Sequence, residues 1–160
     1  YDRKEQGLVV DYVIIMGYDE HYVGSDAGSV ASLPWVEQGV QDTIAEVTPE
    51  RTILAIPFYT RLWKTTGGAV TSEAIGMDEA QNVLSTNGVE AVWDGSVGQN
   101  YATFEQDNST YQIWLEDAQS IAEKVKLIQK YNLAGVAQWK LGFENSSIWQ
   151  TISDNLQAAS

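Results

Sequence analysis

The 160-residue sequence contains no cysteine, one histidine and only 9 basic residues. The absence of cysteine excludes a disulfide framework and a thiolate metal site. Because 22 acidic residues bring the net charge to −13, we expect neither nucleic acid nor an anionic membrane surface as a partner. No apolar run is long enough to span a bilayer. The composition therefore favours a neutral ligand.

The sequence begins at Tyr1, without an initiating methionine or a leader-like segment. We therefore expect a piece of a longer protein. Its hydrophobic content of 44% and aromatic content of 11% are typical of one compact domain with a substantial core.

Two short apolar runs in the first third of the chain predict parallel strands. Residues 9–18 are mostly apolar at odd and at even positions and rich in β-branched side chains. Because alternate positions point to opposite faces, this predicts a strand buried on both faces. Ser32 and Pro34 then predict the start of a helix, whose apolar residues recur at helical spacing as far as Val47. Residues 52–59 form the second run. The order strand, helix, strand predicts a right-handed βαβ unit.

The pattern changes after residue 63. A break at Gly67 and Gly68 precedes a short predicted helix at 77–86, which Asn87 and Gly88 close. Three strand-like runs follow between turn-rich segments, at residues 90–93, 100–104 and 110–115. We predict a small α+β insertion with an antiparallel sheet.

The last part of the chain returns to the first pattern. Ser120 and Glu123 predict a capping box for a helix that ends at Asn132. Residues 135–139 predict a third buried strand, and Ser147 predicts the cap of a last amphipathic helix. The predicted divisions are barrel units at 1–63, the insertion at 64–116, and a final helix, strand and helix at 117–160. Since a complete (β/α)8 barrel needs roughly 250 residues, we predict an α/β fold that forms part of one.

Polar and aromatic side chains lie at the carboxyl ends of these three strands, where parallel α/β folds bind ligands. Tyr18 ends one strand, and Asp19 follows it. Tyr59 and Arg61 end the second strand, and their hydroxyl and fixed cation suit sugar hydroxyls or a carboxylate. Trp139 ends the third, and its indole suits the apolar face of a sugar.

Each of these side chains has a structural alternative. Tyr18 could pack at a strand end while Asp19 caps a turn, and Arg61 could neutralise one of the many acidic residues. Trp139 could be a core residue. Only their combination favours a binding site.

Their sequence context resembles the family-18 glycoside hydrolases, the chitinase and spore-cortex glucosaminidase group. Met16-Gly17-Tyr18-Asp19 resembles the Met-x-Tyr-Asp signature of the sixth barrel strand. Residues 56–61 (IPFYTR) are similar to the seventh-strand Ile-Pro-Phe-Tyr-Gly-Arg, with Thr60 in place of glycine. Residues 111–124 and 135–139 resemble the run into the last helix and strand. Asp19-Glu20-His21 and the Trp63 segment are most similar to the bacterial spore and cell-wall subgroup.

The resemblance implies hydrolysis of β-1,4-linked N-acetylglucosamine polymers, chitin or peptidoglycan, in which the acetamido oxygen of the substrate is the nucleophile. It implies that Tyr18 donates a hydrogen bond to that group, that Asp19 orients the sugar and that Trp139 stacks beneath it. It also implies a secreted, cell-envelope or spore location in a bacterium. The implied substrate-binding residues are Met16, Tyr18, Asp19, Tyr59, Arg61 and Trp139, with Glu20, His21 and Gln138 as weaker candidates.

The proton donor of that family is missing. It is the glutamate of an Asp-x-x-Asp-x-Asp-x-Glu motif on the fourth strand, and none of the 22 acidic residues has this spacing. Glu20 and Glu144 have no neighbouring carboxylate at a spacing that would raise a pKa. We therefore expect the chain to be inactive alone. The alternative is a non-catalytic carbohydrate-binding or structural module of the cell wall or spore.

Two further expectations concern partners. His21 with adjacent carboxylates is too little for a catalytic zinc triad, so we expect no metal and no cofactor. The first strand is expected to have an unpaired apolar edge where the missing N-terminal half of the barrel belongs. Because such edges pair with other chains, we expect a homodimer or a domain swap.

Overall fold

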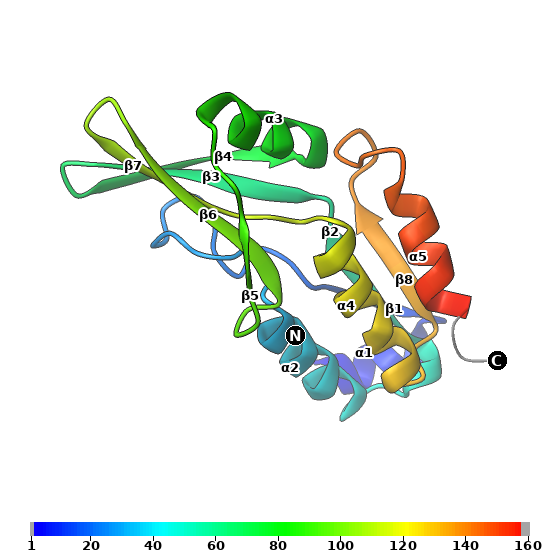
Figure 1. Cartoon of the computed structure of the whole chain (residues 1–160). Helices are drawn as coiled ribbons and strands as arrows, with labels where there is room; N and C mark the ends of the chain where they lie inside the picture. Colours follow the sequence, from blue (N-terminus) through cyan, green and yellow to red (C-terminus); the bar gives the residue numbers. More distant parts are fainter. Residues whose placement is uncertain (1, 158–160) are drawn as a thin grey trace.

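Two β-sheets divide the molecule into a parallel and an antiparallel part (Figure 1). The computed structural model describes residues 2–157. The helices are α1 (Arg3–Val9), α2 (Leu33–Ile44), α3 (Met77–Asn87), α4 (Ala118–Lys130) and α5 (Ile148–Gln157), with a 3-10 helix η1 at Pro49–Arg51. The strands are β1 (Val13–Met16), β2 (Thr52–Pro57), β3 (Tyr59–Thr66), β4 (Ala69–Gly76), β5 (Val92–Asp94), β6 (Gln99–Gln106), β7 (Ser109–Trp114) and β8 (Gly135–Trp139).

The three-stranded parallel sheet has the order β1-β2-β8. Met16 pairs with Ala55, and Ala55 pairs with Ala137. Leu54 and Ile56 point to one face, where α2, α4 and α5 bury them completely in the main core. Burial of this face against helices is what the βαβ pattern predicts, and it makes the fold α/β.

The other face of this sheet is exposed at β1 and at the end of β8, although Ala55 of the central strand is buried, and within residues 2–157 β1 and β8 each pair only with β2. Ile14 and Met16 are 56% and 69% exposed. The prediction of a strand at 9–18 buried on both faces is therefore wrong. The strand is shorter, its side chains alternate between half-buried and exposed, and the sheet is not closed into a barrel in this part of the chain.

Helix α1 precedes β1 and was not predicted. The Asp2 side chain accepts a hydrogen bond from the Glu5 N–H at 3.0 Å, which caps the helix. An acidic cap with glutamate three residues later is the sequence signal for this start.

The five-stranded antiparallel sheet has the order β4-β3-β7-β6-β5, and α3 packs on one of its faces. Strand β3 follows β2 after the single residue Phe58, so the predicted boundary after residue 63 falls inside β3. Gly67 and Gly68, both at positive φ, form the turn of the β3–β4 hairpin. The three strands predicted in this region did not include β3 and β4, because the exposed residues of these two strands are mostly polar.

The predicted helix at 77–86 is confirmed as α3, which ends at Gly88 in the left-handed conformation. The capping box of α4 is formed by Asp117 and Ser120, so its prediction at Ser120 and Glu123 is wrong. Asp117 directly precedes the first turn, and its carboxylate accepts hydrogen bonds from the N–H groups of Gln119 and Ser120 there. Before α5, the Ser147 hydroxyl donates to Asn145 Oδ1 at 3.0 Å. None of the helices described in residues 2–157 is long and apolar enough to cross a membrane.

Candidate functional site

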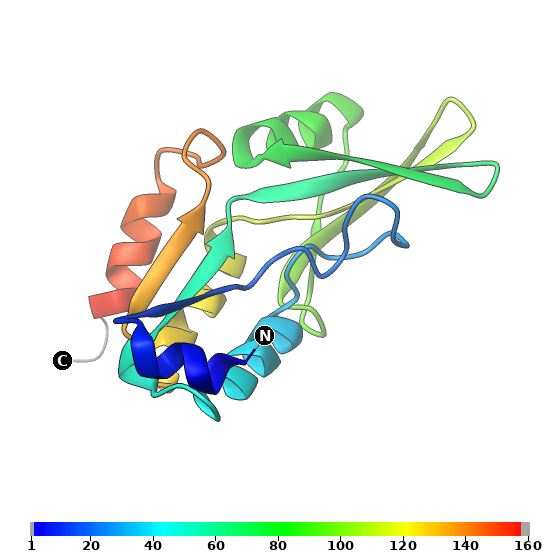
Figure 2. The same ribbon diagram turned by 180° about the vertical axis from the view of Figure 1, so that it is seen from behind.

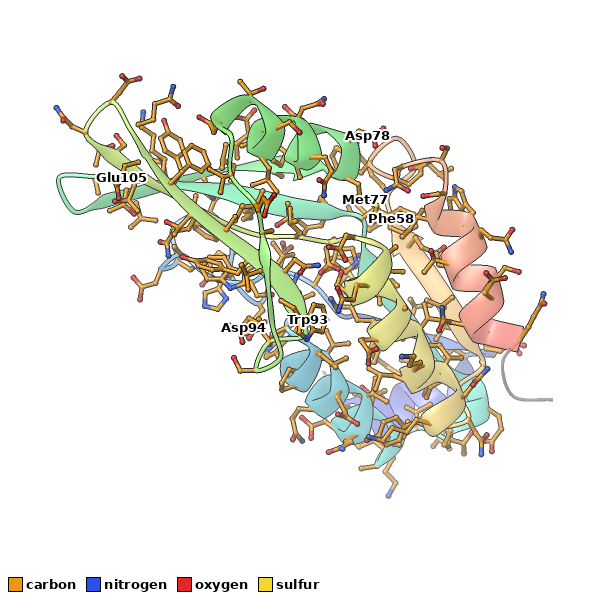
Figure 3. The ribbon with its side chains drawn as sticks, in the orientation of Figure 1. Phe58, Met77, Asp78, Trp93, Asp94 and Glu105 are labelled. Atoms are coloured by element: carbon orange, nitrogen blue, oxygen red, sulfur yellow. The ribbon has the colours of Figure 1, made fainter. Side chains whose placement is uncertain are left out.

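The carboxyl ends of β1, β2 and β8 meet at one edge of the parallel sheet. The Gly17 N–H donates to the Ala55 carbonyl at 2.8 Å and extends the pairing of β1 toward Tyr18. The Phe58 N–H donates to the Trp139 carbonyl at 2.8 Å and joins β2 to the end of β8. Figure 3 shows Phe58 beside Met77, where the chain leaves β2 for the antiparallel sheet. Phe58 is buried in the main core, which fixes the strand ends around it.

Asp19 and Tyr59 are in direct contact at this edge. The Tyr59 hydroxyl donates a hydrogen bond to Asp19 Oδ1. Asp19 has a φ of 66°, a left-handed conformation that aspartate tolerates better than most residues. The Tyr59 ring is buried, whereas Asp19 is exposed. The buried Tyr59 hydroxyl therefore holds the Asp19 carboxylate in place while that carboxylate stays accessible to solvent.

Tyr18 adjoins this pair. Its ring meets the Tyr59 ring edge-on, with centroids 6.2 Å apart. Burial, and then the negative charge of Asp19, raise the pKa of Tyr18. Burial, and then the hydrogen bond to Asp19, raise the pKa of Tyr59. Both phenols are therefore protonated at neutral pH and can act as hydrogen-bond donors.

Trp139 lies at the same edge on the uncovered face. Its side chain is 53% exposed, so it is not a core residue. Gly135 and Ala137 share its face by strand alternation, and their small side chains leave the space beside the indole open. The peptide bond between Trp139 and Lys140 is cis.

Arg61 lies on β3, two residues after Tyr59. Its Nη1 donates to Ser72 Oγ at 3.2 Å, and its Nε is buried without a hydrogen-bond partner. The positive charge of Arg61 acts on Tyr59 and partly offsets the rise of its pKa. Within residues 2–157, no carboxylate forms an ion pair with Arg61, so neutralisation of a nearby acid does not explain it.

Two of the weaker candidates have structural partners. The Glu20 carboxylate accepts hydrogen bonds from the N–H of Ser32 at 2.7 Å and from its hydroxyl at 3.0 Å, at the start of α2. His21 Nδ1 donates to the Ser29 carbonyl at 2.8 Å, and its ring packs on Gly28, where a Cβ would come within 2.5 Å. Both side chains therefore shape the loop between β1 and α2.

Met16 and Gln138 differ in position. Met16 is exposed on the uncovered face, below Tyr18. Gln138 is half-buried and lies on the same face of β8 as Val136, which packs against the main core. It therefore points away from the face of Trp139. In the described part of the chain, no group of three His, Cys, Asp or Glu side chains could hold a metal ion.

Phe143, in the loop after β8, also lies at this edge and was not among the predicted residues. Its ring lies 6.2 Å from that of Tyr59, and its carbonyl accepts the Met77 N–H at 2.8 Å. The Lys140 ammonium lies 4.9 Å from the Phe143 ring centroid. No local pattern marks this residue, because its contacts come from three separate segments.

A groove of about 530 Å³ runs along the free edge of β1, between α1 and α2. Its lining includes Ile14, Met16 and Trp35 but none of Tyr18, Asp19 and Trp139. The groove is therefore an unpaired sheet edge rather than the site itself.

Comparison with known proteins gives a consistent result. Residues 1–144 match the family model described as glycosyl hydrolases family 18. The uncharacterized glycosylase YvbX of Bacillus subtilis (strain 168) is 27% identical over 153 residues, which cover 95% of this chain and 44% of the relative. The cortical fragment-lytic enzyme of the same organism is 26% identical, and the match covers 96% of this chain and 36% of that enzyme. A crystal structure of a chitinase from Chromobacterium violaceum matches with a TM-score of 0.91 at 26% identity. The match covers 98% of this chain and 49% of the chitinase chain. The chain thus spans less than half the length of these relatives.

Proposed function

The chain belongs to glycosyl hydrolase family 18, and from this membership we propose that it supplies part of the substrate cleft of an enzyme that hydrolyses polymers of β-1,4-linked N-acetylglucosamine. The single observation that carries the proposal is the contact of Tyr59 with Asp19 beside Tyr18, at the same sheet edge as an exposed Trp139. Chitin and spore-cortex peptidoglycan both contain this sugar, and relatives are named for a chitinase and for a cortical fragment-lytic enzyme.

In this proposal the chain's residues hold the reacting sugar. Trp139 stacks beneath the ring and buries its apolar face. The neutral Tyr18 hydroxyl donates to the acetamido oxygen as that oxygen forms a bond to C1. The Asp19 carboxylate, fixed by Tyr59, favours the positive charge that develops on the ring and acetamido group. Met16, Tyr59 and Arg61 contact neighbouring parts of the glycan.

The leaving oxygen needs a proton that this chain does not provide. Burial raises the pKa of the Glu116 carboxyl, but its side chain is buried and bonded to Lys124, so it cannot reach a substrate. The donor must come from the barrel strands that precede β1 in this reading. Positioning by the present residues therefore lowers the barrier only together with that acid.

The same reading assigns β1, β2 and β8 to strands six to eight of a (β/α)8 barrel. The exposed side chains on their uncovered face would then line the barrel interior, and the missing N-terminal half would pair with the free edge of β1. In the isolated chain we propose that a second copy occupies this edge, as a homodimer or a domain swap. Sedimentation equilibrium tests this, and a monomer at every concentration would count against it.

The binding role is tested by titrating the purified chain with chitotetraose and measuring the heat of binding by calorimetry. We expect saturable binding without hydrolysis, and roughly tenfold weaker binding by Trp139→Ala. Trp35→Ala is the matched control, because Trp35 is 40% exposed on α2 and lies in the edge groove. Equal binding by wild type and Trp139→Ala, or sustained turnover by the chain alone, would contradict the proposal.

The second candidate function is a non-catalytic carbohydrate-binding or structural module of the cell wall or spore. The missing Asp-x-x-Asp-x-Asp-x-Glu spacing favours it. The coding sequence upstream of Tyr1 decides between the two: glutamate at the end of that motif supports the enzyme, and Gln or Leu there supports the module. In either case we propose a bacterial cell-envelope or spore location, which the name of the cortical fragment-lytic relative supports.

A further inference from the structure

A buried chain of polar side chains connects the loop that carries Asp19 to helix α4. Gln99, at the start of β6, is completely buried. Its Oε1 accepts a hydrogen bond from Ser29 Oγ, and its Nε2 donates to the Leu115 carbonyl at 3.1 Å and to Glu116 Oε1 at 3.0 Å. Because the acceptor and the donor group of this amide are both engaged, its orientation is fixed.

At its far end, this series of hydrogen-bonded side chains includes the Glu116–Lys124 ion pair. Lys124 Nζ lies 2.9 Å and 3.0 Å from the two carboxylate oxygens, and Ser120 Oγ donates to the same carboxylate at 2.8 Å. Both charged side chains are almost fully buried. Complete hydrogen bonding of both partners offsets the cost of removing their charges from water. The pair joins Glu116, in the segment before α4, to Lys124 of α4.

The near end is the loop of residues 17–32 between β1 and α2. Figure 2 shows this loop running from β1 to the antiparallel sheet and back to α2. The Trp63 indole N–H donates to the Gly28 carbonyl at 2.9 Å, and the Ala31 N–H donates to Ser29 Oγ at 3.0 Å. The Glu20 N–H donates to the Val30 carbonyl at 2.9 Å and joins the two sides of the loop.

The turn before Gln99 reinforces this contact. Gly98 has a φ of 68°, and a Cβ at this position would lie 2.7 Å from the Leu33 Cβ. The Leu33 N–H donates to the Val97 carbonyl at 2.8 Å. Figure 3 shows Trp93 and Asp94 of the same turn region beside the start of α2. The end of the loop therefore rests directly on the segment that carries Gln99.

We propose that Gln99 is a positioning residue for the candidate site. Its bonds to Ser29 and Glu116 hold the loop against the ion pair, and the loop holds Asp19 in its left-handed conformation against Tyr59. The inference rests on the proposed function only for the identity of the ligand. A merely structural Gln99 would support the fold without controlling the loop or the affinity for a glycan.

The test is Gln99→Met, which keeps a similar side-chain length and removes the hydrogen bonds of the amide. The matched control is Gln112→Met on β7, whose amide donates to the Tyr101 hydroxyl at 2.9 Å and not to the loop. The readouts are amide hydrogen exchange of residues 19–32, the ring ¹⁵N signals of His21 and the dissociation constant for chitotetraose. His21 is the single histidine of the chain, so its signals are unambiguous.

For Gln99→Met we expect about tenfold faster exchange in residues 19–32, shifted His21 signals and about tenfold weaker binding. Gln112→Met should change none of these. If Gln99→Met does not fold, Ser29→Ala removes the same link from the loop side and should have the same effects. Unchanged loop exchange and His21 signals in a folded variant would overturn the inference. If wild type does not bind chitotetraose, the proposed function fails, and the exchange and His21 readouts still decide the inference.

Discussion

The two faces of the parallel sheet differ in what covers them. On one face, Leu54 and Ile56 are completely buried by helices. On the other face, Ile14, Met16 and Trp139 are more than half exposed. The covered face supplies the stability of the fold, whereas the open face presents aromatic and polar side chains at its upper edge. Because its side chains at β1 and at the end of β8 are accessible, the open face is the side of the sheet on which the proposed contacts with a glycan and with another chain can form.

The largest effect is expected on the covered side, from Lys124→Met. Removal of the ammonium leaves the buried Glu116 carboxylate without its cation, which should lower the free energy of unfolding by roughly 3–5 kcal/mol. Urea denaturation measures this change. The double variant Glu116→Leu/Lys124→Met removes both charges and should recover part of the loss. Equal losses in the single and double variants would contradict a charge-based explanation.

The loss of unfolding free energy in Lys124→Met should depend on pH. Burial already raises the pKa of Glu116, and Lys124 acts against this rise. Without Lys124, the folded-state pKa lies further above the unfolded-state value, so the folded state binds the proton first as the pH falls. The destabilisation is therefore complete above the folded-state pKa and decreases as the pH falls toward the ordinary value of 4.5. Urea denaturation at neutral and at mildly acidic pH measures this difference.

A pair of truncations compares the two faces directly. Ile56→Ala opens a cavity in the covered core and should cost about 2–5 kcal/mol of unfolding free energy. Met16→Ala removes an exposed side chain from the open face and should change the same quantity by less than about 0.5 kcal/mol. Similar losses for the two variants would show that the open face is covered in solution, for instance by a second copy.

The smallest effect concerns the phenols at the edge of the open face. Burial and the hydrogen bond to Asp19 raise the pKa of Tyr59, so it should ionise after the exposed tyrosines in an alkaline titration followed by absorbance. Asp19→Asn removes the negative charge and should lower this pKa toward 10.0. Asp26→Asn, an exposed acid in the same loop, is the control. An unchanged titration of Asp19→Asn would mean that the contact does not persist in solution.

The sequence predicted the elements whose patterns are local and strong. Residues 52–59 and 135–139 are short apolar runs, and they contain β2 (Thr52–Pro57) and β8. The prediction that residues 135–139 are buried is wrong, because every residue of β8 is half-buried or exposed. Trp139 ends β8 as predicted, whereas Tyr59 and Arg61 were predicted to end the second strand and instead belong to β3, which Tyr59 begins. Gly88 after a periodic segment marked the end of α3, because a left-handed residue there satisfies the last carbonyls.

The elements that were missed depend on distant contacts. The polar alternation of β3 and β4 resembles a loop until the sheet pairs Trp63 with Ser72 and Gln112. The role of Gln99 depends on partners 17 and 70 residues away, which no spacing rule connects. The bond of the Glu20 carboxylate to Ser32 at the start of α2 likewise has no local pattern in the sequence.

The most direct test of the central claim is amide hydrogen exchange of the full chain with and without chitotetraose. We expect slower exchange in the presence of the sugar at residues 16–20, 59–61 and 138–141, and unchanged exchange in α2, α4 and α5. Protection confined to the helices or to the antiparallel sheet, or no protection at saturating sugar, would contradict the claim that the edge of the open face binds the glycan.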